Sequence, residues 1–230
     1  MKTLGLIGGT SWVSTVDYYR IINQTVNEKM GGLNSAKLFL YSVNFAEVKK
    51  FVDENNWNGV SFIFCAAAKK LEQAGAEGIV ICANTPHKIA DDIRKVIQVP
   101  FIHIAEATTI EIKKWRINQV GLLGTKFTME DNFFKGKLSE EQIGALIPHM
   151  DDREFIHGSI FNELGQGIFT QETRQRYLAI INKLVEQGAE GIIFGCTEIP
   201  LLIKPDDCSV PVFDTTIIHA KAAVEFALKD

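Results

Sequence analysis

The sequence predicts an α/β protein of two similar lobes, each with a parallel sheet flanked by helices. Two observations support this fold class. Short apolar runs alternate with amphipathic helical patterns along the whole chain, and several short sequence segments occur twice in the same order. Because most apolar runs lack the alternation of half-exposed strands, we expect strands that helices cover on both faces.

The repeated phrases keep a nearly constant offset. LGLIGGT at 4–10 is echoed by VGLLGTK at 120–126, GAEGIV at 75–80 by GAEGII at 188–193, and VPFIHIA at 99–105 by VPVFDTT at 210–216. Any two parallel-sheet halves resemble each other in composition, but a repeated GAEGI segment is a more specific similarity than shared composition. The pattern indicates an internal duplication. We therefore expect the lobes to be related by a pseudo-two-fold axis, with the active site in the cleft between them.

The elements follow from the apolar runs. The expected strands are Thr3–Ile7, Lys37–Ser42, Gly78–Ile81, Phe101–Ile104, Val120–Leu123, Gly191–Phe194 and Val212–Phe213. One helix is expected to begin at Ser14 and to stop at Gly31, because glycine favours the position after a helix. Another is expected after Thr170, ending at Gly188. The segment from Lys135 to Glu154 has the least regular pattern, which we interpret as an insertion.

Composition excludes several function classes. The chain is 46% hydrophobic and 23% charged, as in ordinary globular proteins. Its net charge is −4 and its basic residues are scattered, which argues against a nucleic-acid partner. The first apolar run is too short for a signal sequence, and no run approaches a membrane span. We expect a cytoplasmic protein without a membrane partner.

The cysteines lack CxxC spacing and HExxH is missing, so disulfides and a metal site are not expected.

Two cysteines follow the repeated GAEGI phrase. Ligands of open α/β sheets bind beyond the carboxyl ends of the strands, and Cys82 and Cys196 each stand there, just before a helix. We expect Thr85 to cap the first helix, with Pro86 at its first position, and Thr197 to cap the second. Backbone N–H groups at such helix starts bind carboxylates and lower the pKa of a neighbouring thiol. A single free cysteine is usually buried and contributes only to packing. Two cysteines at equivalent positions of duplicated lobes favour a functional role.

Two turns also offer polar groups at strand ends. Gly8-Gly9-Thr10-Ser11 follows the first strand, and its counterpart is Gly124-Thr125, with Thr128 expected to open the next helix. Neither turn matches GxGxxG or GxxxxGK[ST], so nucleotide binding has little support. A capping role alone explains these threonines as well as ligand contact does.

Three motifs together carry a family resemblance. IGGTSW near the start, CANT at 82–85 and GCTEI at 195–199 resemble the aspartate/glutamate racemase family over essentially the whole chain. The resemblance implies an amino-acid racemase that uses no pyridoxal phosphate, no other cofactor and no metal. It implies that Cys82 and Cys196 act as an acid/base pair on opposite faces of the substrate α-carbon. It also implies a homodimer, and a final helix that returns to the first lobe.

The same resemblance implies the lobe boundaries and the remaining site residues. We expect a first lobe of residues 1–103 with 214–230 and a second lobe of residues 104–213. The expected substrate-binding residues are Thr10, Ala83, Asn84, Thr85, Thr125, Thr128 and Thr197, and Glu198 is expected to assist the second cysteine. Val52 stands where the family reads the substrate side chain, and Gly165 stands where a lysine is typical. A neutral substrate is therefore an open alternative to an acidic one.

Two other functions stay open. Cys82 paired with His87 would suit a nucleophilic hydrolase, or an isomerase of the hydantoin racemase-like or maleate isomerase-like type. Against this reading, the helix start is expected to turn His87 away from the strand end. A two-lobed protein that binds a small molecule without any chemistry is the third hypothesis.

Overall fold

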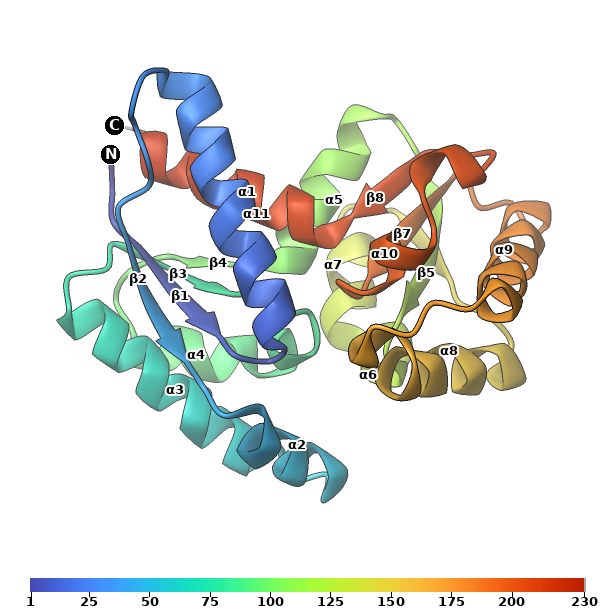
Figure 1. The fold of residues 1–230 in the computed structure, drawn as a ribbon, viewed down its shortest axis with the longest axis horizontal. Coiled ribbons are helices and arrows are strands. Elements are labelled where there is room, and N and C mark those ends of the chain that lie inside the picture. The colour runs from blue at the N-terminus through green and yellow to red at the C-terminus, as the bar shows by residue number, and fades with distance from the viewer. Residues whose placement is uncertain (230) are drawn as a thin grey trace. The chain divides into compact units, whose positions relative to one another are not determined.

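The structure is a computed structural model that describes residues 1–229. The chain forms two compact units, one of residues Met1–Ile104 with the chain from Thr216 onward, the other of Ala105–Thr215. Each unit contains a parallel sheet (Figure 1). The sheet has four strands in each unit, in the order β2-β1-β3-β4 in the first and β6-β5-β7-β8 in the second. The predicted fold class, with two parallel sheets flanked by helices, is confirmed.

The elements of the two units follow the same order of strand and helix. The first unit contains β1 (Leu4–Gly8), α1 (Trp12–Met30), β2 (Leu38–Ser42), α2 (Phe45–Asp53), α3 (Trp57–Gln73), β3 (Gly78–Ile81), η1 (Thr85–Ile89, a 3-10 helix), α4 (Ala90–Val96), β4 (Phe101–Ile102) and α11 (Thr215–Leu228). The second contains α5 (Ile104–Lys114), β5 (Gln119–Gly124), α6 (Lys126–Glu130), α7 (Asn132–Glu140), β6 (Gly144–Leu146), α8 (Met150–Asn162), η2 (Leu164–Gln166), α9 (Gln171–Glu186), β7 (Gly191–Gly195), α10 (Ile199–Leu202), η3 (Pro205–Asp207) and β8 (Val212–Asp214).

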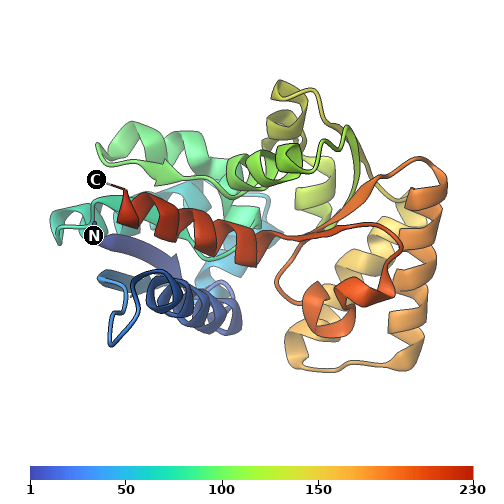
Figure 2. The same cartoon turned by 90° about the horizontal axis from the view of Figure 1, so that it is seen from above.

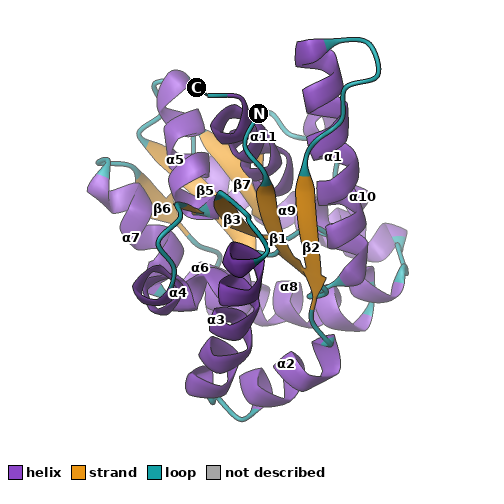
Figure 3. Cartoon of the chain, turned by 90° about the vertical axis from the view of Figure 1, so that its left-hand side faces the viewer, coloured by secondary structure: helices purple, strands orange, loops and turns teal. Residues whose placement is uncertain are grey.

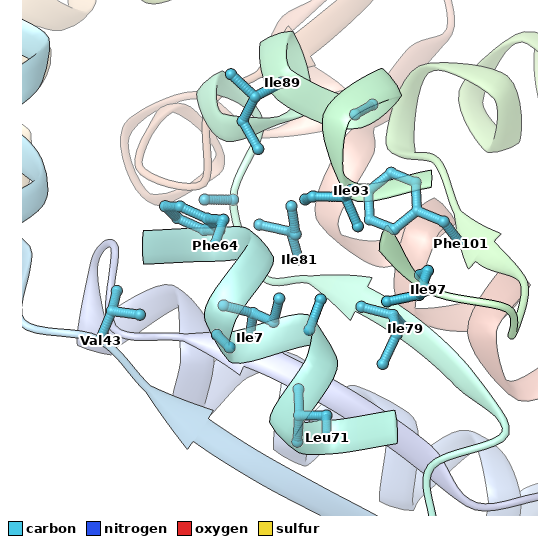
Figure 4. Packing of buried hydrophobic residues seen from close by; sticks show 14 of the residues in the cluster. Ile7, Val43, Phe64, Leu71, Ile79, Ile81, Ile89, Ile93, Ile97 and Phe101 are labelled. Carbon is cyan, nitrogen blue, oxygen red and sulfur yellow. The ribbon is translucent and has the colours of Figure 1, made fainter. Parts of the chain in front are cut away.

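Helices cover both faces of the first sheet (Figure 3). Along β1 and β3 the side chains alternate between the two helical layers, as strand geometry requires. Leu6 and Val80 pack in a core cluster with α1 and α11. Ile7 and Ile81 point the other way and pack with Phe64 of α3 and with α4 (Figure 4). Continuous burial on both faces explains why these strands read as uninterrupted apolar runs.

The last helix, α11, belongs to the first unit. Its small residues Ala220 and Ala223 lie in the core cluster with Tyr18 of α1. The backbone N–H of Lys2 donates to the carbonyl of Ala227 at 2.7 Å, so the end of α11 lies beside the start of the chain (Figure 2). In the second unit, a single core cluster joins β5 and β7 to α8, α9 and α10.

One interpretation of the sequence is wrong. The segment from Lys135 to Glu154 is not an insertion, because it contains most of α7, the strand β6 and the start of α8. β6 pairs with β5, with Leu146 opposite Gly121, just as β2 pairs with β1. The strand is only three residues long and is not fully buried, so its apolar signal is weak. The duplication therefore extends to all four strands of each sheet.

The start of α1 and the end of β4 differ from the prediction. α1 begins at Trp12, two residues before Ser14, and Ser11 is its N-cap. Its C-cap is Gly31, where the helix was expected to stop. β4 stops at Ile102, because Ile104 already begins α5. α9 is capped by Thr170 as predicted. Across residues 1–229, every helix is too short or too polar to cross a membrane.

Candidate active site

The first unit gathers its predicted site residues at one edge of its sheet. β1 and β3 are neighbours, with Ile7 opposite Ile81, so the turns that follow them lie at the same edge. The backbone N–H of Cys82 donates to the carbonyl of Ile7 at 2.9 Å, which fixes the start of the second turn. Cys82 and Thr10 thus stand at the carboxyl ends of adjacent strands, where open α/β sheets bind ligands.

The turn after β1 depends on glycine. Gly9 has φ +98°, and a Cβ there would lie 2.1 Å from the carbonyl oxygen of Val43, so no other residue fits. Its N–H donates to Thr15 Oγ1 at 2.9 Å. The next residue, Thr10, is 8% exposed, and its Oγ1 has no hydrogen-bond partner within residues 1–229. A buried hydroxyl without a partner is costly unless something else binds it, so Thr10 is suited to contact a ligand.

The loop from Cys82 to Thr85 is held from two sides. Ser14 Oγ of α1 donates to the carbonyl of Cys82 at 3.0 Å and to that of Ser11 at 2.9 Å. The His87 ring contacts the carbonyls of Ala83 and Asn84 through Nδ1, at 2.9 and 3.2 Å. Sequence reasoning missed Ser14 as an anchor, because its partner lies 68 positions away along the chain.

The second unit repeats this arrangement with different chemistry. β5 and β7 are neighbours, with Gly124 opposite Gly195. A Cβ on Gly195 would lie 2.8 Å from the carbonyl oxygen of Leu123, so glycine permits the two strand ends to approach closely. Thr125 follows β5 and Cys196 follows β7, which places their turns at one edge of this sheet.

Cys196 has a carboxylate partner. Its Sγ donates to Glu198 Oε2 at 2.9 Å, and Thr197 Oγ1 donates to the same oxygen at 2.7 Å. Burial raises the pKa of the Cys196 thiol well above its ordinary value, and the charge and hydrogen bond of Glu198 raise it further. The expected contact of Glu198 with the second cysteine is therefore present.

Cys82 has no such partner. It is 1% exposed, and within residues 1–229 its Sγ makes no hydrogen bond. Burial alone raises the pKa of the Cys82 thiol. Both thiols therefore favour the protonated form.

The net shift of both thiol pKa values is opposite to the one that the helix starts predict. Cys82 is followed by η1, a five-residue 3-10 helix, and Cys196 by the four-residue α10. At Cys82 the desolvation of a buried thiolate raises the pKa. At Cys196 the backbone N–H groups of Thr197 and Glu198 lower the pKa, but burial and the charge of Glu198 raise it by more.

The predicted caps are also wrong. Asn84 is the N-cap of η1, with Thr85 its first residue, and Glu198 is the N-cap of α10. Thr197 instead bonds to Glu198. Thr128 does not open a helix, because it lies inside α6, which Thr125 caps by accepting from the N–H of Thr128 at 3.3 Å.

The His87 side chain is buried in the core of the first unit. Its ring packs 4.8 Å from that of His103, 5.3 Å from that of His219 and 5.4 Å from that of Phe101, measured between centroids. Neither of its ring nitrogens bonds to Cys82 within residues 1–229. A thiolate–imidazole nucleophile therefore has no support. No local sequence pattern indicates this histidine cluster, because His219 is distant along the chain.

The two positions linked to side-chain recognition lie in different settings. Val52, on α2, is partly buried and packs against the core of the first unit. Gly165 lies in η2, where a Cβ would be 2.8 Å from the carbonyl oxygen of Ile160, so the backbone leaves no room for a side chain. In residues 1–229 no three His, Cys, Asp or Glu side chains are arranged to hold a metal ion.

Comparison with known proteins gives the family. The model of the Asp/Glu/Hydantoin racemase family matches residues 7–223. The chain belongs to this family. It is similar to the broad specificity amino-acid racemase RacX of Bacillus subtilis (strain 168), with 26% identity over 157 residues, which are 68% of this chain and 67% of that protein.

Two solved structures resemble the chain over the full length of both proteins. One is a putative Asp/Glu racemase from Yersinia pestis, with 50% identity and a TM-score of 0.95. The other is an aspartate racemase homologue from Pyrococcus horikoshii OT3, with 38% identity and a TM-score of 0.87. These relatives support racemase activity for the family member described here.

Proposed function

We propose that this protein interconverts the L and D enantiomers of an amino acid without pyridoxal phosphate, with Cys82 and Cys196 as its two acid/base groups. One observation carries the proposal. The two thiols stand at equivalent strand ends, after β3 and after β7, in two units that share strand order and repeated sequence. A racemase needs one proton-transfer group on each face of a planar carbanion, and a duplicated unit supplies such a pair.

The reaction breaks the α C–H bond and forms it again on the other face. The thiolate of one cysteine takes the α-proton, and the electron pair of the C–H bond is delocalised into the substrate carboxylate. The thiol of the other cysteine then gives its proton to the opposite face and becomes a thiolate. Exchange with solvent restores the starting protonation state. Because the thiols share one substrate, they titrate as a pair.

Neighbouring groups assist these steps in the proposal. The substrate ammonium group favours a thiolate beside it, which offsets part of the desolvation that raises both thiol pKa values. Glu198 accepts the Cys196 proton along their 2.9 Å hydrogen bond and returns it when Cys196 acts as an acid. Thr10, Thr125 and Thr128 with the Ala83–Thr85 and Thr197 segments hold the substrate, and their N–H groups stabilise charge on its carboxylate.

The relatives and two uncharged positions bear on the substrate class. The names of the relatives suggest aspartate, glutamate or a broader set of amino acids. Val52 and Gly165 carry no charge at the positions linked to side-chain recognition, which keeps neutral amino acids among the candidates. A homodimer and a cytoplasmic location also stay predictions.

A panel of acidic and neutral amino acids in deuterated water tests the proposal. The purified protein, without added cofactor, is incubated with single enantiomers, and NMR and chiral chromatography follow the α-position and the enantiomer ratio. We expect at least one amino acid to racemise with deuterium at its α-carbon. Unchanged substrate throughout the panel would contradict the proposed activity, and tight binding without exchange would identify a binding protein instead.

A further inference from the structure

The His87 ring is bonded to the loop that carries Cys82. Nδ1 lies 2.9 Å from the carbonyl oxygen of Ala83 and 3.2 Å from that of Asn84. Carbonyl oxygens only accept hydrogen bonds, so Nδ1 must carry the proton. The neutral ring therefore has its hydrogen on Nδ1 and a lone pair on Nε2.

The other ring nitrogen, Nε2, makes no hydrogen bond to the described residues. His87 is 1% exposed, and within residues 1–229 its Nε2 has no hydrogen-bond partner. Burial lowers the pKa of His87, and the nearby rings of His103 and His219 lower it further, so the ring stays neutral. A buried nitrogen without a partner destabilises the fold, and only the Nδ1 side offsets that cost. An apolar ring would pack in the same space without the cost of a buried nitrogen that lacks a partner.

The bonds of His87 complete a set of three. Ser14 donates to the carbonyl of Cys82, and His87 binds the next two carbonyls along the chain. In a planar trans peptide, the carbonyl of one residue and the N–H of the next point in opposite directions. Fixing these carbonyls therefore also fixes the directions of the N–H groups of Ala83, Asn84 and Thr85.

We propose that His87 is a positioning residue, whose Nδ1–H holds the Cys82 loop in its working geometry. This inference rests on the proposed function, because Cys82 and the N–H groups that follow it are the groups it would orient. His87 itself transfers no proton. An error in the direction of those groups slows proton transfer more than it weakens substrate binding, because the charge they stabilise develops in the transition state.

Three variants separate positioning from packing. His87→Phe keeps an aromatic ring but removes the Nδ1–H donor. His87→Asn keeps a donor in the place of Nδ1 but removes the ring. His219→Phe is the matched control, since it alters the same cluster through bonds to Tyr18 and to the carbonyl of Ile102, neither of which lies in the loop.

Two readouts are compared at equal fractions folded, set by urea unfolding. The first is the split between kcat and KM for racemisation, and the second is the alkylation rate of Cys82, mapped by mass spectrometry. We expect His87→Phe to lower kcat on the order of 10- to 100-fold with KM little changed, and to speed alkylation of the buried Cys82. We expect His87→Asn to restore most of the kcat and most of the protection of Cys82 from alkylation. We expect His219→Phe to leave kcat and the alkylation rate near the wild-type values.

The inference is overturned if His87→Phe keeps wild-type kcat and Cys82 protection, or if His87→Asn is as impaired as His87→Phe. It is also overturned if His219→Phe has the same effects at matched stability. Failure of the proposed function gives a different result, since the wild-type protein would then racemise nothing. The alkylation rates of the three variants then decide the positioning role alone.

Discussion

The two units share a scaffold but surround their thiols differently. Cys82 lies among apolar side chains of the first unit, and its neighbouring carbonyls are bonded to Ser14 and His87. Cys196 donates directly to the carboxylate of Glu198. The duplication kept the position of the thiol, whereas the groups around it diverged. In one unit hydrogen bonds hold the loop that carries the thiol, and in the other a carboxylate accepts a hydrogen bond from the thiol itself.

Replacing either thiol has the largest expected effect. Cys82→Ser and Cys196→Ser should each lower racemisation by about a thousandfold, because serine is too weakly acidic to replace a thiol in proton transfer. The thiol that remains still serves one face, so residual α-proton exchange should occur with one enantiomer only, and with opposite enantiomers in the two variants. NMR in deuterated water measures this. Exchange of the same enantiomer by both variants would show that the thiols do not serve opposite faces.

Acid should destabilise the first unit more than the second. Burial lowers the pKa of His219 to about 4, from an ordinary value of 6.5, so the folded protein favours the neutral ring. As pH falls below 6.5 the unfolded chain takes up a proton first, and about 3 kcal/mol is lost between pH 6.5 and 4. His87 adds to the loss in the same direction. The histidines of the second unit, His149 and His157, are not buried.

Hydrogen exchange at pH 7 and pH 4.5 tests this difference between the units. Peptides from residues 1–104 should lose protection at pH 4.5 while peptides from 105–215 keep theirs. In His219→Phe the acid effect on the first unit should shrink, because one of its titrating groups is gone. Equal loss in both units would show that the histidine cluster does not set the acid stability.

Glu198 should have a smaller effect, confined to the Cys196 side. Glu198→Gln keeps the size of the side chain but removes the proton acceptor, so we expect kcat/KM to fall about tenfold. The fall in kcat/KM must be equal for the L-to-D and the D-to-L reaction, because the two enantiomers are equally stable and the equilibrium constant is one. The α-deuterium isotope effect should rise only in the direction in which Cys196 removes the proton. An equal rise in both directions would rule out a specific role beside Cys196.

Much of the fold was predictable from sequence, as was the placement of two cysteines at strand ends. Apolar runs and the repeated GAEGI segment locate most of the strands, and the structure places Cys82 just after β3 and Cys196 just after β7. β6 was missed because a short, partly exposed strand leaves little pattern. The thiol pKa values were mispredicted because desolvation depends on packing around the residue, which a local motif does not show. The bond from His219 to the carbonyl of Ile102 joins residues 117 positions apart, and no local signal reports it.

The isotope content of the first product molecules tests the two-thiol account most directly. A single enantiomer with protium at its α-carbon is incubated in deuterated water, and product and remaining substrate are analysed before a few per cent has reacted. With one thiol on each face, the product should carry deuterium from the solvent while the remaining substrate keeps its protium. Product that retains the protium of the substrate would show one group acting on both faces, which contradicts the account.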